Sequence, residues 1–184
     1  AIGLVAGFFR RLDAPMSRLI DAMMAFPDIL LAIALVSILG GSIINVIIAL
    51  SIVYAPRIAR IVRASTLVIR ELPYVEAAVA LGSSTLTIMT THVLRSILSP
   101  IIVQATFIFA YAMLAEAGLS FLGVGVPPPE PAWGLMLADG KQAMMIGKWW
   151  LTVLPGVCIM LTVLSASILG DFMRDRFDPK GRMR

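Results

Sequence analysis

Charged residues are scarce in this sequence, and their scarcity excludes an ordinary soluble domain. Lys, Arg, Asp and Glu make up 14% of the 184 residues, whereas about 25% is typical of soluble proteins. Apolar residues make up 59%, and the mean hydropathy is +0.94. A chain with so little charge and so much apolar side chain uses lipid as its main solvent, so we expect a membrane protein.

Cysteine and histidine are almost absent, and their scarcity bears on disulfide bonds and on zinc sites. Cys158 is the one cysteine in the chain, so an internal disulfide is excluded. His92 is the one histidine, which argues against a zinc site of the usual kind. We therefore expect no resident metal and no cofactor.

The motifs of two enzyme classes are also missing. A phosphate-binding P-loop needs a glycine five residues before Gly-Lys and a Ser or Thr after it. Neither Gly140-Lys141 nor Gly147-Lys148 meets either requirement. An intramembrane serine protease needs a Ser and a His that meet, but Ser120 and His92 are expected at opposite ends of one span. The sequence therefore predicts that the chain is not an enzyme.

A long uncharged run covers residues 29–56 and has two interpretations. At ~1.5 Å per residue one helix of that length would reach about 42 Å, beyond the ~30 Å hydrocarbon core. Gly40-Gly41-Ser42, near its middle, favours a turn. The run is either one tilted helix or two spans, and two spans would extend over Ala22–Phe26 and Tyr54–Val62. Pro27 and Pro56 would then be kinks near their ends.

Two further spans are clearer, at about residues 97–122 and 149–169. Between them, Pro127–Pro131 contains four prolines, which enforce extended backbone because proline lacks the N–H that a helix needs. Trp133, Trp149 and Trp150 flank this loop, as is typical of an aromatic belt at a membrane interface.

The basic residues distinguish the two interpretations of the first run. With two spans, 13 of the 15 Lys and Arg residues fall on one side of the membrane, and only Lys141 and Lys148 fall on the other. With one span the division is 10 to 5. Because basic residues concentrate in cytoplasmic loops, two spans are favoured. Residues 57–95 and the C-terminus are then cytoplasmic, and the proline-rich loop is external.

The loop at about residues 71–95 has a helix–glycine–helix pattern. Pro73 suits a helix start, Gly82 breaks the helix, and Ser83-Ser84-Thr85 can cap a second one. Small residues at Ala77, Ala78 and Gly82 allow a partner to come close. An amphipathic helix lying at the lipid headgroups would show the same pattern, and the pattern alone does not separate the two.

Several stretches resemble one family, the permease subunits of bacterial ABC importers, which are the inner-membrane components of binding-protein-dependent transport. Glu76-Ala77-Ala78 followed by Gly82 looks like the EAA loop of these permeases, and the rest agrees with the branch that carries dipeptides, oligopeptides and nickel. One departure is His92-Val93-Leu94-Arg95-Ser96, where the family usually has His-x-Leu-Pro-Asn. The matching stretches are AFPDILLAIALVSILG (25–40), YVEAAVALG (74–82), AEAGLSFLGVGVPPPEPAWGLML (115–137), LPGVCIMLTVLSASILGD (154–171) and RDRFDP (174–179).

The resemblance implies an all-α, polytopic transmembrane helix bundle of the type I ABC importer permease fold. Residues 1–173 would form the transmembrane domain, lacking the family's first helix and external segment, and residues 174–184 a cytoplasmic tail. The coupling residues would be Glu76, Ala77, Ala78, Leu81 and Gly82.

The same resemblance implies partners and a location. The partners would be cytoplasmic ABC ATPases, a second homologous permease, an external solute-binding protein and membrane lipid, with no nucleic acid. The location would be the bacterial cytoplasmic (inner) membrane. The solute (dipeptide, oligopeptide, nickel or glutathione) stays open, as does homodimeric or heterodimeric pairing, although the family favours the latter. An ATP-independent channel or ion-coupled carrier is the alternative function.

Glu116 is the most unusual single residue, because a carboxylate inside an apolar span is costly. It either faces the translocation pathway or is neutralised within the bundle for packing, and the sequence favours neither. Arg57, Arg60 and Arg63 recur at helical spacing. We expect them to reach lipid headgroups or the coupling loop rather than substrate.

Overall fold

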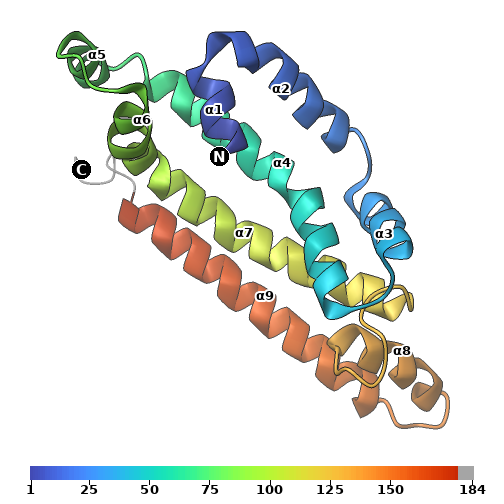
Figure 1. Ribbon diagram of the computed structural model, residues 1–184. Coiled ribbons are helices and arrows are strands. Elements are labelled where there is room, and N and C mark those ends of the chain that lie inside the picture. Colours follow the sequence, from blue (N-terminus) through green and yellow to red (C-terminus); the bar gives the residue numbers. More distant parts are fainter. Residues whose placement is uncertain (178–184) are drawn as a thin grey trace. The chain divides into compact units, whose positions relative to one another are not determined.

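Every regular element of the described chain is helical, which confirms the all-α class. The computed structural model describes residues 1–177. The predicted RDRFDP match and cytoplasmic tail lie partly outside these residues, and Lys180, Arg182 and Arg184 lie wholly outside. The helices, in chain order, are α1 (Ile2–Phe8), α2 (Arg10–Met24), α3 (Asp28–Leu39), α4 (Ile43–Ile69), α5 (Pro73–Ala80), α6 (Thr85–Thr87), the π-helix η1 (Ile88–Val93), α7 (Leu94–Phe121), α8 (Trp133–Met144) and α9 (Trp150–Phe177) (Figure 1).

The chain divides into two compact units. Unit 1 contains Ala1–Ala25, Ala55–Ala105 and the chain from Gly170 on, and unit 2 contains Phe26–Tyr54 and Thr106–Leu169. The long helices α4, α7 and α9 each contribute residues to both units. Each unit has its own apolar core and is described separately below.

Within residues 1–177, three continuous helical stretches are long and apolar enough to cross a membrane. They are α4 with 27 residues, the helix Thr85–Phe121 with 37, and Trp150–Arg176 with 27. At ~1.5 Å per residue each is at least about 40 Å long, more than the hydrocarbon core requires. No more than 39% of the apolar window of any of them is buried within the chain. Most of their apolar side chains are therefore free to contact lipid or another subunit.

The uncharged run at residues 29–56 divides into two helices at the Gly40-Gly41-Ser42 turn, as the glycines predicted. Gly40 ends α3 with φ +87°, a conformation that a residue with a side chain rarely adopts. Asn45 then donates from Nδ2 to the Leu39 and Gly40 carbonyls, at 2.7 and 2.9 Å, which satisfies the end of α3. The Ser42 hydroxyl accepts from the Asn45 amide at 3.1 Å and caps the start of α4.

The predicted first span, extended over Ala22–Phe26, is interrupted at Pro27. Ala22 to Met24 belong to α2, and α3 begins at Asp28. Pro27 explains the break, because proline restrains the residue before it to extended backbone and offers no N–H to a continuing helix. The 12-residue α3 spans only ~18 Å by itself, so α2 and α3 together form either one broken span or a re-entrant segment. Toward the other end, α4 continues through Pro56 as predicted and reaches Ile69.

Candidate functional site

The helix–glycine–helix predicted in the 71–95 loop is present in unit 1. α5 begins with Pro73 in its first turn and ends before Gly82, whose φ is +78°. The Ser83 amide donates back to the Ala78 carbonyl at 3.1 Å, closing the helix end. The Ser84 hydroxyl then accepts from the Thr87 amide at 3.2 Å and starts α6, as the capping pattern predicted.

The two faces of this element differ. Val75 and Ala78 are 2% and 7% exposed and pack with Ile88, Met89 and Val93 in the unit 1 core. Glu76, Ala77, Leu81 and Gly82 are exposed. The predicted coupling residues therefore separate: four lie at the surface, whereas Ala78 attaches α5 to its own unit.

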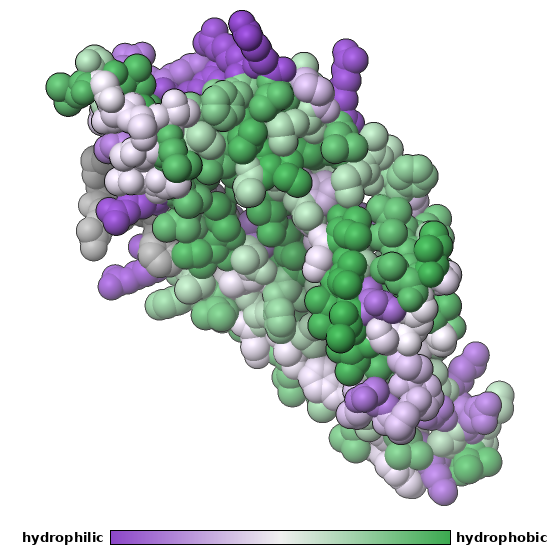
Figure 2. All heavy atoms as spheres, in the orientation of Figure 1, coloured by the Kyte–Doolittle hydropathy of each residue, from purple (hydrophilic) through white to green (hydrophobic). Residues whose placement is uncertain are grey.

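The exposed side of α5 and α6 is apolar at its tip. Leu81 is 86% exposed and Leu86 71%, with Val79 also exposed. Figure 1 places α5 at the periphery of unit 1, and Figure 2 shows apolar side chains over it. Exposed leucines beside a surface carboxylate, Glu76, are typical of a site for a protein partner.

Tyr74 connects α5 to the start of α7. Its hydroxyl lies 2.9 Å from the Ser96 hydroxyl, and its ring centre is 6.3 Å from that of His92. Ser96 in turn donates to the His92 carbonyl at 2.8 Å. The helix from Thr85 onward is continuous through η1 into α7. These contacts join α5 to a continuous helix that is long and apolar enough to cross a membrane.

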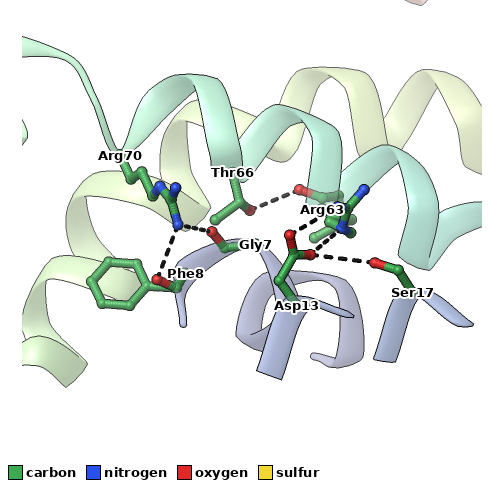
Figure 3. A network of polar contacts seen from close by, with 8 residues as sticks. Gly7, Phe8, Asp13, Ser17, Arg63, Thr66 and Arg70 are labelled. Carbon is green, nitrogen blue, oxygen red and sulfur yellow. Dashed lines mark hydrogen bonds and ion pairs between the residues drawn. The ribbon is translucent and has the colours of Figure 1, made fainter. Parts of the chain in front are cut away.

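Arg60 and Arg63 of α4 pair with aspartates of α2 rather than with the coupling loop, and Arg70, just after α4, contacts α1 (Arg63 and Arg70 are shown in Figure 3). Arg63 forms two hydrogen bonds with the Asp13 carboxylate of α2, one of them at 2.9 Å. Arg60 pairs with Asp21 at 2.6 Å. Arg70 donates to the Gly7 carbonyl at 2.9 Å, at the C-terminal end of α1. A guanidinium suits this place because the carbonyls at a helix C-terminus carry partial negative charge.

Glu116, the second candidate site, lies in unit 2 and lines a cavity of about 420 Å³. Ser120, one helical turn on, donates to Glu116 Oε1 at 2.6 Å. The fully buried Ser120 hydroxyl also accepts from the Val126 amide at 3.2 Å, so it links the carboxylate to the loop after α7. This close approach needs Gly125, where an added Cβ would lie 2.4 Å from Ser120 Oγ.

Helix α8, which follows the proline-rich loop, forms one wall of this cavity. An added Cβ at Gly134 would lie 2.2 Å from the Ala117 carbonyl oxygen of α7. At Gly140 it would lie 2.6 Å from the Thr152 hydroxyl of α9. Two glycines thus let α8 pack directly on both neighbours and hold Trp133 and Met136 at the cavity lining. Within the described residues, no three His, Cys, Asp or Glu side chains are placed to hold a metal ion.

Comparison with known proteins identifies the family. Residues 1–183 match the family of binding-protein-dependent transport system inner membrane components. The chain belongs to this family of transport permeases. The helices described above are therefore those of a membrane protein, as the composition predicted.

Curated relatives of this permease-family chain agree along nearly its whole length. A putative peptide transport system permease protein of Brucella abortus is 49% identical over 99% of this chain and 61% of its own length. The dipeptide transport system permease protein DppC of Alkalihalophilus pseudofirmus is 47% identical over 97% of the chain and 59% of its own length. The glutathione transport system permease protein GsiD of Pectobacterium atrosepticum is 41% identical over 97% and 60%. The chain thus spans about 60% of the length of these relatives.

Sequence reasoning missed several contacts at the permease's two candidate sites. The Tyr74–His92–Ser96 group joins residues up to 22 positions apart, and no local pattern connects them. The Glu116–Ser120 pair had a signal, because residues four apart lie on one helix face.

Proposed function

We propose that this chain is the transmembrane permease subunit of an ATP-driven ABC importer for peptides or related small solutes. It forms half of the translocation pathway and couples to a separate ATPase. The exposed α5–α6 element carries this proposal: in a chain of this family, it presents Glu76, Ala77 and Leu81 outward while Ala78 anchors it. The names of the relatives, which include peptide, dipeptide and glutathione permeases, support peptides or related small solutes as the cargo.

The proposed location is the bacterial cytoplasmic membrane, with several spans. The exposed arginines of α2 and the basic end of α9 belong to the cytoplasmic side, in accord with the positive-inside rule. Purple side chains along α2 in Figure 2 mark this charged surface within unit 1. The partners in the proposal are cytoplasmic ABC ATPases, a second homologous permease and an external solute-binding protein.

The mechanism follows from the contacts of α5. When the ATPases close, they push on the exposed face of α5 and α6. Because Val75 and Ala78 are packed in the unit 1 core and Tyr74 contacts Ser96, the push reaches α7 rather than only displacing a surface loop. Glu116 lies further along the same helix and is proposed to face the pathway.

The test is ATP hydrolysis by the complete transporter reconstituted in liposomes with its binding protein. Glu76→Lys should abolish stimulation by the binding protein while the subunits still assemble and basal hydrolysis persists. Glu76 is exposed, so the substitution does not disturb the core of unit 1. Asp175→Lys is the control, because it places the same charge on an exposed residue of unit 1 outside the α5–α6 element.

Two results would overturn the proposal. Unchanged stimulation in Glu76→Lys would show that α5 is not the coupling element. Solute uptake by the chain in the absence of any ATPase would instead establish the carrier alternative.

A further inference from the structure

The unit 2 cavity beside Glu116 has the composition of a site for an organic cation. Its lining combines one carboxylate with an aromatic ring and apolar side chains. Its volume of about 420 Å³ lies within the ~300–1,000 Å³ range of small-molecule sites. The lining residues are Ile43, Met113, Glu116, Val126, Pro131, Ala132, Trp133 and Met136.

Glu116 is the one ionisable residue of that lining. Among the described side chains it makes no ion pair, and its recorded partner is the Ser120 hydroxyl. One hydroxyl leaves most of the acceptor positions of a carboxylate available, since a carboxylate has about four. The cavity therefore offers an oriented negative charge in apolar surroundings, where attraction to a cation is stronger than in water.

Ser120 positions the Glu116 carboxylate, and Gly134 positions α8 at the same cavity. The hydroxyl of Ser120, fully buried, donates to Glu116 and accepts from Val126, which itself lines the cavity. On the other side, Gly134 holds α8 against α7 at the level of Ala117 and Ser120. This packing sets Trp133 in the same lining as Glu116. A cavity whose lining includes both a carboxylate and an indole is suited to an ammonium group, which gains from the charge and from an aromatic ring.

We propose that this cavity binds a protonated amino group of the transported solute, with the Glu116 carboxylate as its acceptor and Trp133 as an aromatic wall. This rests on the proposed function, since it names the solute chemistry that the pathway takes. An ethanolamine lipid headgroup carries the same ammonium chemistry, so the experiment must separate the two sources.

The experiment measures the modification of one cysteine in the cavity. Met136→Cys is introduced in a Cys158→Ser background, because Cys158 is exposed and would react. The complete transporter is placed in nanodiscs of phosphatidylglycerol, which has no amine. Rates are compared for a cationic trimethylammonium-ethyl and an anionic sulfonatoethyl methanethiosulfonate, read by intact mass of this chain. Met145→Cys, at an 89% exposed residue outside the lining, is the matched control.

The carboxylate should favour the cationic reagent at residue 136. Glu116→Gln should lower the ratio of cationic to anionic rate by about three- to tenfold, as expected for the loss of one charge in a partly hydrated site. Glu116→Asp should keep most of the preference, and the ratio at Met145→Cys should not change. Alanylalanine should slow the cationic reagent at residue 136, whereas N-acetyl-alanylalanine should not, because acetylation removes the charge.

An unchanged ratio in Glu116→Gln would overturn the proposal. The dipeptide comparison tests the proposal independently if that variant does not assemble. The proposal is also overturned if alanylalanine and N-acetyl-alanylalanine slow modification at residue 136 equally, or if neither slows it. Slowing that appears only when phosphatidylethanolamine is added, with no effect of alanylalanine, would assign the cavity to a headgroup and refute a solute site. Stimulated ATP hydrolysis is measured on the same samples, so a failure of coupling is seen separately from a failure of cation binding.

Discussion

Replacing Gly134 by alanine should destabilise the protein, even though alanine is the better helix former. The added Cβ would lie 2.2 Å from the Ala117 carbonyl oxygen and 2.8 Å from Ser120 Cβ. Distances below 3.0 Å are essentially never seen for real Cβ atoms, and the Ala117 carbonyl, held within the last turns of α7, cannot rotate away. α8 must therefore move off α7 by roughly 0.8 Å or more.

The expected net loss is about 1–2 kcal/mol. Overpacking of this kind costs about 1–3 kcal/mol, and the gain in helix propensity returns up to ~1 kcal/mol. For a chain of this size, each kcal/mol shifts the unfolding midpoint by about 2–4 °C. The thermal midpoint of the purified protein in detergent should therefore fall by several degrees.

Gly118→Ala is the matched control in the same unit. Gly118 lies within α7, and its nearest neighbour to an added Cβ is the Ile29 Cδ1 atom at 3.8 Å, an ordinary contact. Alanine there gains propensity without a clash, so its midpoint should stay the same or rise. Equal midpoints for Gly134→Ala and Gly118→Ala would refute the close packing of α8 on α7.

Two further predictions concern unit 1. Double-mutant cycles should give the Arg63–Asp13 pair a coupling energy of about 1–2 kcal/mol and the Arg60–Asp21 pair less than ~1 kcal/mol. The first pair makes two hydrogen bonds and is less exposed, so it should contribute more. Equal coupling energies for the two pairs would contradict this. Replacing Gly82 by alanine should cost ~1–2 kcal/mol of local stability because the φ at this position is +78°. Steric clash does not contribute, since no atom would lie within 4 Å of the added Cβ. Asparagine should be better tolerated there. Hydrogen exchange of the α5–α6 amides measures both variants, and equal exchange in the two would argue against the left-handed conformation.

Apolar runs, glycines and helix-capping residues predicted the helices well. Gly40 and Gly82 lie at helix ends, where the sequence predicted breaks, and both have positive φ; Ser84 is the helix cap that its sequence context indicated. These features could be predicted because each depends on the backbone preferences of the residue itself and its immediate neighbours. The EAA-like stretch and its flanking motifs also predicted the family, which the match over residues 1–183 confirms.

The sequence did not reveal what two groups of residues pack against. Ala78, expected to let a partner come close, packs with Ile88, Met89 and Val93 of its own unit. Arg60 and Arg63, expected to reach headgroups or the coupling loop, pair with Asp21 and Asp13 of α2. Helical periodicity shows that such residues share a face and does not show what packs against that face.

The sequence by itself determined that this chain is a helical membrane protein, where its helices break and to which family it belongs. The first two properties follow from hydropathy and from local backbone preferences, which a short segment carries alone; the family follows from the resemblance of the EAA-like stretch and its flanking motifs. Only the tertiary structure decided which face of α5 is free and how Glu116 is held. It also decided that α8 forms a wall of the cavity beside Glu116. Those depend on contacts between segments distant in sequence, whose geometry is set by packing rather than by any local signal.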